Sequence, residues 1–118
     1  MRSIFRKFLL ASVLCTANIA SPSLAAEPNA NDILEAYDAD MDWAKAGLVG
    51  MYSGMFWMNA FLKDDGQPKL YCVPDELGIT PEQNASILKE FIKKDGRAGK
   101  FPAGLALLTA YKFTFPCN

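Results

Sequence analysis

Hydrophobic side chains recur at helical spacing in several stretches of this chain. In residues 29–42 the spacing fits one apolar face of a helix, and that face carries Ile33, Leu34, Tyr37 and Met41. Asn31 is suited to cap this helix, and acidic residues without a basic neighbour fill its outer face. We therefore predict a first helix with an acidic outer surface.

The segment from Ala44 to Leu62 is the most apolar part of residues 27–118 and includes 17 consecutive uncharged residues. A membrane span is an alternative for this segment, but the run is at the lower limit of length and contains polar residues and three glycines. Gly50 and Gly54 form a GxxxG pair, which permits close helix contact in membranes and in soluble bundles. We favour the central helix of a soluble bundle, buried on most sides.

The strongest helix start follows a turn at Lys63–Lys69. Thr80 is a candidate N-cap, Pro81 occupies the first helical position, and Gln83 completes a capping box. The apolar face of this third helix consists of Ile87, Leu88, Phe91 and Ile92. Asp95-Gly96 should end it. A glycine-rich basic loop, residues 97–100, then leads to a fourth helix.

Pro102 can start that fourth helix, because proline is tolerated at a helix N-terminus. The side chains expected to line it are Leu105, Leu107, Leu108, Tyr111 and Phe113. The pattern as a whole predicts an all-α fold, a compact bundle of about four helices.

The N-terminus has the pattern of a secretory signal peptide. Arg2, Arg6 and Lys7 precede the short apolar run Phe8–Leu14, and Ser23-Leu24-Ala25-Ala26 offers small residues for cleavage after Ala25 or Ala26. An uncleaved membrane anchor is the alternative, but the apolar run is short for a bilayer span. We therefore expect residues 1–26 to be removed, leaving a single periplasmic domain, residues 27–118, with no membrane attachment.

Signal-peptide removal leaves two cysteines, Cys72 and Cys117, and cysteines in exported chains usually pair. The predicted disulfide closes a loop of about 46 residues, worth roughly 4 kcal/mol in the chain-entropy model. A metal-binding or catalytic thiol is the alternative, but the chain has no histidine, which excludes a Cys/His zinc site. The mature chain carries nine basic and 13 acidic residues, a net charge of −4, which argues against nucleic-acid binding.

Candidate chemistry is sparse, so we expect neither an enzyme nor a cofactor. Without histidine there is no Ser-His or Cys-His nucleophile pair, and adjacent carboxylates such as Asp64-Asp65 usually point apart into solvent. Met51, Met55 and Met58 stand at i, i+4 and i+7 and could form a thioether site for Cu(I), although core packing is the favoured interpretation.

Binding to another protein remains as the expected activity. The acidic first helix, the turn at Lys63–Lys69 and the basic loop at Lys93–Lys100 are candidate surfaces, and each could instead be ordinary solvated surface. The loop is the preferred contact because it is glycine-rich and lies between two well-marked helices. Its candidate contact residues are Lys94, Asp95, Gly96, Arg97 and Lys100.

An ordered set of motifs resembles the Rap/Tai family of type VI secretion immunity proteins. The motifs are Tyr71-Cys72-Val73-Pro74, Gly78-Ile79-Thr80-Pro81-Glu82-Gln83, Phe91-Ile92, Phe101-Pro102-Ala103 and Phe115-Pro116-Cys117, with Gly50-Met51-Tyr52-Ser53-Gly54 upstream. The resemblance covers Ala46 to Cys117. Two features depart from the family pattern: residues 44–49 lack a cysteine found in many members, and the acidic turn at residues 64–66 has no counterpart.

The resemblance implies a compact all-α periplasmic fold with the Cys72–Cys117 bridge. It also implies a function, namely binding and blocking a peptidoglycan amidase effector delivered by neighbouring bacteria, often as a homodimer. A small periplasmic acid-stress chaperone with one disulfide is the alternative function, in which protonation of the acidic first helix would lower solubility. Copper binding by the methionine helix is a third possibility.

Overall fold

The computed structural model describes residues 26–118, so the signal-peptide prediction lies, except for Ala26, outside the described residues. Helices make up the described fold, and it contains no β-strand. The elements are α1 (Ala30–Asp38), α2 (Asp42–Asp64), α3 (Pro81–Lys94), the 3₁₀-helix η1 (Gly96–Lys100) and α4 (Ala103–Thr114). The predicted all-α bundle of four helices is confirmed, as is its single disulfide.

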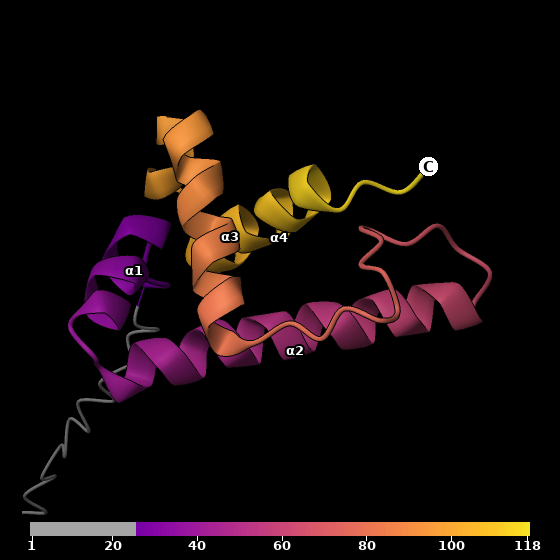
Figure 1. The fold of residues 1–118 in the computed structure, drawn as a ribbon, viewed down its shortest axis with the longest axis horizontal. Coiled ribbons are helices and arrows are strands. Elements are labelled where there is room, and N and C mark those ends of the chain that lie inside the picture. Colours follow the sequence, from indigo (N-terminus) through magenta and orange to yellow (C-terminus); the bar gives the residue numbers. More distant parts are fainter. Residues whose placement is uncertain (1–25) are drawn as a thin grey trace, which may run out of the picture.

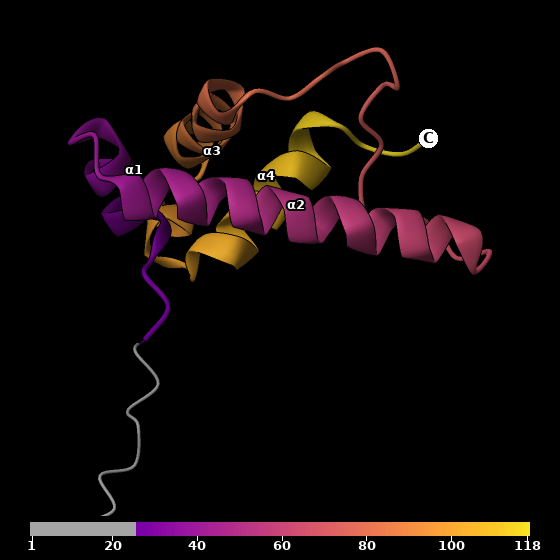
Figure 2. The same ribbon diagram turned by 90° about the horizontal axis from the view of Figure 1, so that it is seen from below.

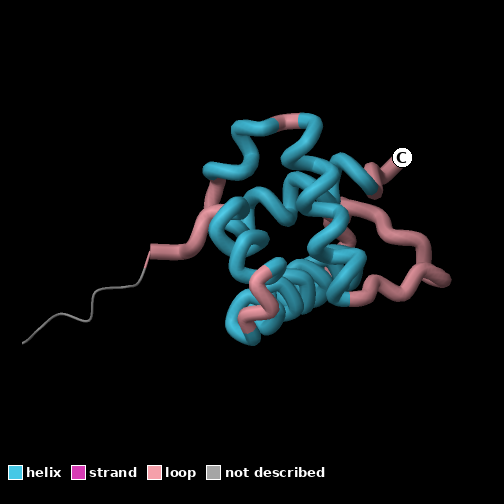
Figure 3. The backbone as a smooth tube through the Cα atoms, turned by 60° about the vertical axis from the view of Figure 1, so that its left-hand side comes forward, coloured by secondary structure: helices cyan, strands magenta, loops and turns pink. Residues whose placement is uncertain are grey.

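Helix α2 is the longest element and lies along one side of the others (Figure 1). Helices α1, α3 and α4 all pack against it. Figure 2, seen from below, shows α2 in front with no other helix over it. Figure 3 places the long loop of residues 65–80 on one side of the molecule and the connection through η1 at another edge. None of the described helices combines the length and apolar character needed to cross a membrane.

The first helix is shorter than the sequence pattern predicts. Helix α1 ends at Asp38, and the chain turns at Asp40, which has a positive φ of 62°. Met41 is therefore exposed just before α2 instead of on the apolar face of α1. The N-cap is Asn29, whose side chain accepts a hydrogen bond from the Asp32 N–H at 2.9 Å, so the prediction of Asn31 as the cap is wrong.

The residues just before α1 also complete the start of α4. The Ala30 N–H donates to the Phe101 carbonyl and the Ala103 N–H donates to the Pro28 carbonyl, each at 3.0 Å. The Glu27 carboxylate accepts from the Gly104 N–H at 2.9 Å. Since Pro102 offers no capping side chain, Glu27 supplies an acceptor and a negative charge at this helix N-terminus.

Helix α3 begins as predicted. The Thr80 hydroxyl accepts from the Gln83 N–H at 3.2 Å, and the Gln83 side chain accepts from the Thr80 N–H at 2.8 Å, which completes the capping box. Leu88 and Phe91 of its predicted apolar face are buried. On α4, however, Leu105 and Phe113 are exposed, which corrects their assignment to the core. Small side chains bury the α4 face instead, namely Ala103, Ala106 and Ala110, beside Leu107 and Tyr111.

Tyr111 is the largest fully buried side chain. Its ring packs against Tyr52, Tyr71 and Phe115, with ring centroids 5.5, 5.0 and 5.7 Å away. Its hydroxyl donates to Asn84 Oδ1 at 3.0 Å, and Asn84 Nδ2 donates to the Leu48 carbonyl at 2.8 Å. This buried chain of hydrogen bonds joins α4, α3 and α2 through a single asparagine.

The disulfide fastens the C-terminal tail to the long loop. Cys72 and Cys117 are bonded, with their Cα atoms 5.0 Å apart. The Cys72 N–H also donates to the Phe115 carbonyl at 2.8 Å. The segment before α3 and the segment after α4 are therefore held side by side by one covalent bond and one backbone hydrogen bond.

Candidate functional site

The predicted contact loop is an ordered 3₁₀ turn. Asp95 caps it, accepting from the Arg97 N–H at 3.2 Å, and also accepts from Arg97 Nε and Nη2 at 3.0 and 3.1 Å. The hydrogen bond from Arg97 is the main cause that lowers the pKa of Asp95. Ala98 and Gly99 are buried, and a Cβ added at Gly99 would clash with the Asn31 side chain.

The five predicted contact residues divide into three groups in the structure. Lys94 lies over the Phe113 ring, 4.7 Å from its centroid, so it packs on its own chain. Asp95 and Gly96 shape the turn. Arg97, whose side chain is 85% exposed, and Lys100 present positive charge to solvent. The loop packs against α1, α3 and α4 but not α2, so its basic tip lies away from α2.

A second surface is not indicated by the sequence pattern, which predicts that the central helix is buried on most sides. That expectation is wrong, because the buried residues of α2 are Ala44, Leu48 and Asn59. Trp57 and Phe61 are each 67% exposed, and Trp43 is 49% exposed. We call this the α2 face and define it as Trp43, Ala46, Gly50, Gly54, Trp57 and Phe61, all exposed.

The α2 face is continuous along the helix. Trp43, Gly50 and Trp57 are seven residues apart, and Phe61 follows Gly54 at the same interval, which keeps these positions on one side of the helix. A Cβ added at Gly50 or Gly54 would meet no atom within 4 Å. Contiguous exposed apolar surface of this kind is typical of a protein interaction site.

The methionines of α2 mostly belong to the core. Met51 and Met55 are partly buried and pack against it, as the core interpretation expects. Met58 is 51% exposed and lies outside it. The row of three is therefore divided between two environments.

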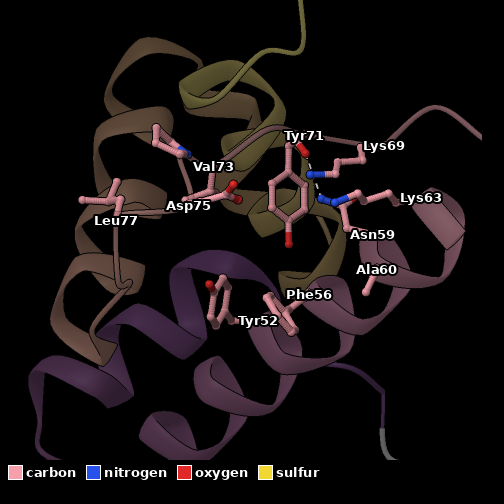
Figure 4. A pocket seen from close by; sticks show the side chains of 11 residues that line it. Tyr52, Phe56, Asn59, Ala60, Lys63, Lys69, Tyr71, Val73, Asp75 and Leu77 are labelled. Atoms are coloured by element: carbon pink, nitrogen blue, oxygen red, sulfur yellow. Dashed lines mark hydrogen bonds between the residues drawn. The ribbon is translucent and has the colours of Figure 1, made fainter.

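A cavity of about 260 Å³ lies between α2 and the loop of residues 69–77 (Figure 4). Asn59 connects this loop to α2 through two hydrogen bonds. Its Nδ2 donates to the Tyr71 carbonyl and its Oδ1 accepts from the Leu70 N–H, both at 2.8 Å. Tyr71 is 3% exposed, and its hydroxyl has no hydrogen-bond partner among the described residues. Burial raises the pKa of Tyr71 to about 12, so the hydroxyl keeps its proton at neutral pH.

Comparison of the chain with protein-family models, curated proteins and solved structures finds no match. The described residues therefore define a structural class of protein. It is a disulfide-linked helical bundle with an ordered basic loop, an exposed aromatic helix face and a small cavity.

Proposed function

We propose that the mature chain is a periplasmic immunity protein that binds and occludes a cell-wall amidase effector of the type VI secretion system. The observation that carries the proposal is the ordered loop at η1, which presents Arg97 and Lys100 on a fixed backbone. An inhibitor that occludes an active-site cleft needs a pre-organised loop, because ordering a flexible loop on binding costs affinity. Asp95 and the buried Ala98 and Gly99 provide that order.

The positions of the resembling motifs support the same proposal. Cys72 and Cys117 form the bridge, and the Thr80–Gln83 capping box starts α3. Phe101-Pro102-Ala103 leads into α4 and pairs with the segment before α1. These motifs lie where helices begin or where distant segments are joined, which is consistent with a shared scaffold whose binding residues differ between members.

The α2 face suits a second copy of the chain. In an antiparallel pair centred between Gly50 and Gly54, these glycines would meet their counterparts, so the two backbones could approach closely. Trp57 would then lie over the small Ala46 of the other copy, and Trp43 would meet Phe61. Such an interface uses the same patch on both subunits, as two-fold symmetry requires. The η1 loops would stay exposed, since they do not contact α2.

The effector-binding proposal predicts a charge-reversal phenotype. The exported, disulfide-bonded protein should inhibit the amidase encoded beside it when peptidoglycan hydrolysis is measured. Arg97→Glu combined with Lys100→Glu should weaken inhibition by roughly 100-fold or more, because each removed contact of this kind costs on the order of 1–2 kcal/mol. Lys112→Glu, which reverses an exposed charge on α4, is the matched control and should inhibit normally.

Inhibition that survives both loop reversals would remove the loop from the interface, and a wild-type protein without effect on the amidase would overturn the function. The dimer is tested separately by sedimentation. Trp57→Glu with Phe61→Glu should give a monomer that retains the helical circular-dichroism spectrum, because both side chains are exposed in one copy. A monomeric wild type would contradict the dimer.

An acid-stress chaperone remains the second candidate, because the α2 face already exposes two tryptophans and a phenylalanine. That function predicts dye binding and protection of client proteins at low pH without any amidase partner. It also predicts that Trp57→Glu with Phe61→Glu abolishes client protection, whereas the paired loop variant Arg97→Glu/Lys100→Glu leaves it unchanged.

A further inference from the structure

The cavity beside α2 has apolar walls and a polar interior group. Tyr52 and Phe56 of α2 face Val73 and Leu77 of the loop across it (Figure 4). A cavity of roughly 150 Å³ accommodates benzene, so about 260 Å³ has room for one aromatic ring and a small polar group. The cavity size matches one amino-acid residue better than an extended ligand.

The Tyr71 hydroxyl is a hydrogen-bond donor that has no acceptor among residues 26–118. Figure 4 shows it directed towards Tyr52 and Phe56, inside the ring of cavity residues. A buried hydroxyl without a partner destabilises a fold, and an occupant that brings an acceptor recovers the lost bond. The hydroxyl is buried from solvent, so an acceptor reaches it only when a neighbouring side chain such as the half-exposed Phe56 changes its rotamer.

The position of Tyr71 is determined from three sides. Asn59 holds its backbone through two hydrogen bonds, the adjacent Cys72 is bonded to Cys117, and the Tyr71 ring packs on Tyr111. An occupant therefore meets a pre-formed wall and does not have to order the loop on binding.

Charge at the cavity favours an anion. Lys63 and Lys69 extend towards it from one side and Asp75 lies on the other (Figure 4). None of these three residues makes a salt bridge with another described residue. Two ammonium groups without a carboxylate partner suit a carboxylate ligand, while Asp75 is placed to accept an N–H.

We propose that this cavity binds an N-acylated amino acid with an aromatic side chain and an ionised carboxylate. The carboxylate lies with Lys63 and Lys69, and the aromatic ring lies against Tyr52 and Phe56. Tyr71 donates its hydroxyl hydrogen to the acyl oxygen. The same chemistry is offered by a small free acid and by the C-terminal residue of a peptide. This site is independent of the amidase proposal, because it shares no residue with the η1 loop.

The test is a titration of the exported, oxidised protein with N-acetyl-L-phenylalanine, followed by backbone amide NMR. We expect saturable shifts in residues 59–63 and 69–77, with a Kd on the order of 0.1–1 mM for a ligand of this size. The neutral N-acetyl-L-phenylalaninamide should bind at least about tenfold more weakly, because it lacks the charge that the lysines recognise. A tetrapeptide ending in phenylalanine, with a free or amidated C-terminus, distinguishes the two sources by its affinity relative to the small acid.

Three variants assign the contacts. Tyr71→Phe keeps the ring and the fold, and it should weaken binding of N-acetyl-L-phenylalanine about fivefold or more. Lys63→Gln with Lys69→Gln should bind acid and amide equally. Lys112→Gln, on α4, is the control and should bind like the wild type. Equal binding of acid and amide by the wild type, shifts confined to other residues, or no saturation up to about 10 mM would overturn the proposal.

Discussion

Replacing both bridging cysteines, Cys72→Ser with Cys117→Ser, should lower the free energy of unfolding by about 4 kcal/mol. The two residues are 45 positions apart in sequence, and the chain-entropy model gives this value for a loop of that length. Small domains are stable by only about 5–15 kcal/mol, so the variant should be near the limit of folding at 37 °C. For a domain of this size the melting temperature should fall by roughly 15–30 °C.

Urea denaturation of the wild type and the double variant, with and without a thiol reductant, measures this effect. The reductant should destabilise the wild type to the level of the variant and leave the variant unchanged. Besides the disulfide, the Cys72–Phe115 backbone hydrogen bond also joins the tail after α4 to the long loop. Loss of protection from hydrogen exchange should therefore be largest in these two segments. A loss below about 1 kcal/mol would mean that the bridge is incidental to stability.

Replacing Asn84 by alanine should lower the free energy of unfolding by about 3 kcal/mol. The side chain is 1% exposed, donates to the Leu48 carbonyl and accepts from the Tyr111 hydroxyl. Its removal leaves that hydroxyl buried without a partner, which costs more than the net value of one hydrogen bond. It also breaks the hydrogen bonds that connect α2, α3 and α4 through this side chain.

A double-mutant cycle separates the two bonds of Asn84. Tyr111→Phe removes the hydroxyl together with its need for a partner, so we expect it to cost less than Asn84→Ala, and the coupling between the sites should be about 1–2 kcal/mol. Lys93→Ala, an exposed position on the same helix, is the control and should stay within about 0.5 kcal/mol of the wild type. If Asn84→Ala costs no more than this control, the network is not a stabilising one.

The sequence predicts a structural feature correctly where that feature depends on residues close together in the chain. The capping box at Thr80 and Gln83 depends on residues three positions apart, so the start of α3 could be read directly. Residues 27–118 contain two cysteines, which allow one pairing, and the structure has it. Hydrophobic periodicity indicated α1 and α3, and a long uncharged apolar run indicated α2.

Non-local contacts decided the start of the first helix. Asn31 and Asn29 are both suitable caps by residue type, and the pairing of residues 28–30 with residues 101–103 places the helix start so that Asn29 is the cap. That pairing joins segments about 70 residues apart, so no local pattern could reveal it. The capping of α4 by Glu27 has the same origin.

The sequence by itself determined the helical class and the strongest cap, because these depend on residue type and short spacing. It also determined the disulfide, because residues 27–118 contain two cysteines. Only the tertiary structure decided which side of α2 is covered. Its apolar residues surround the helix, so periodicity marks no preferred face. Trp57 and Phe61 lie on the exposed side of α2, whereas Asn59 between them contacts the long loop and is buried. The hydrogen bonds from Asn59 to the long loop and the burial of the Tyr71 hydroxyl likewise arise only when distant segments meet.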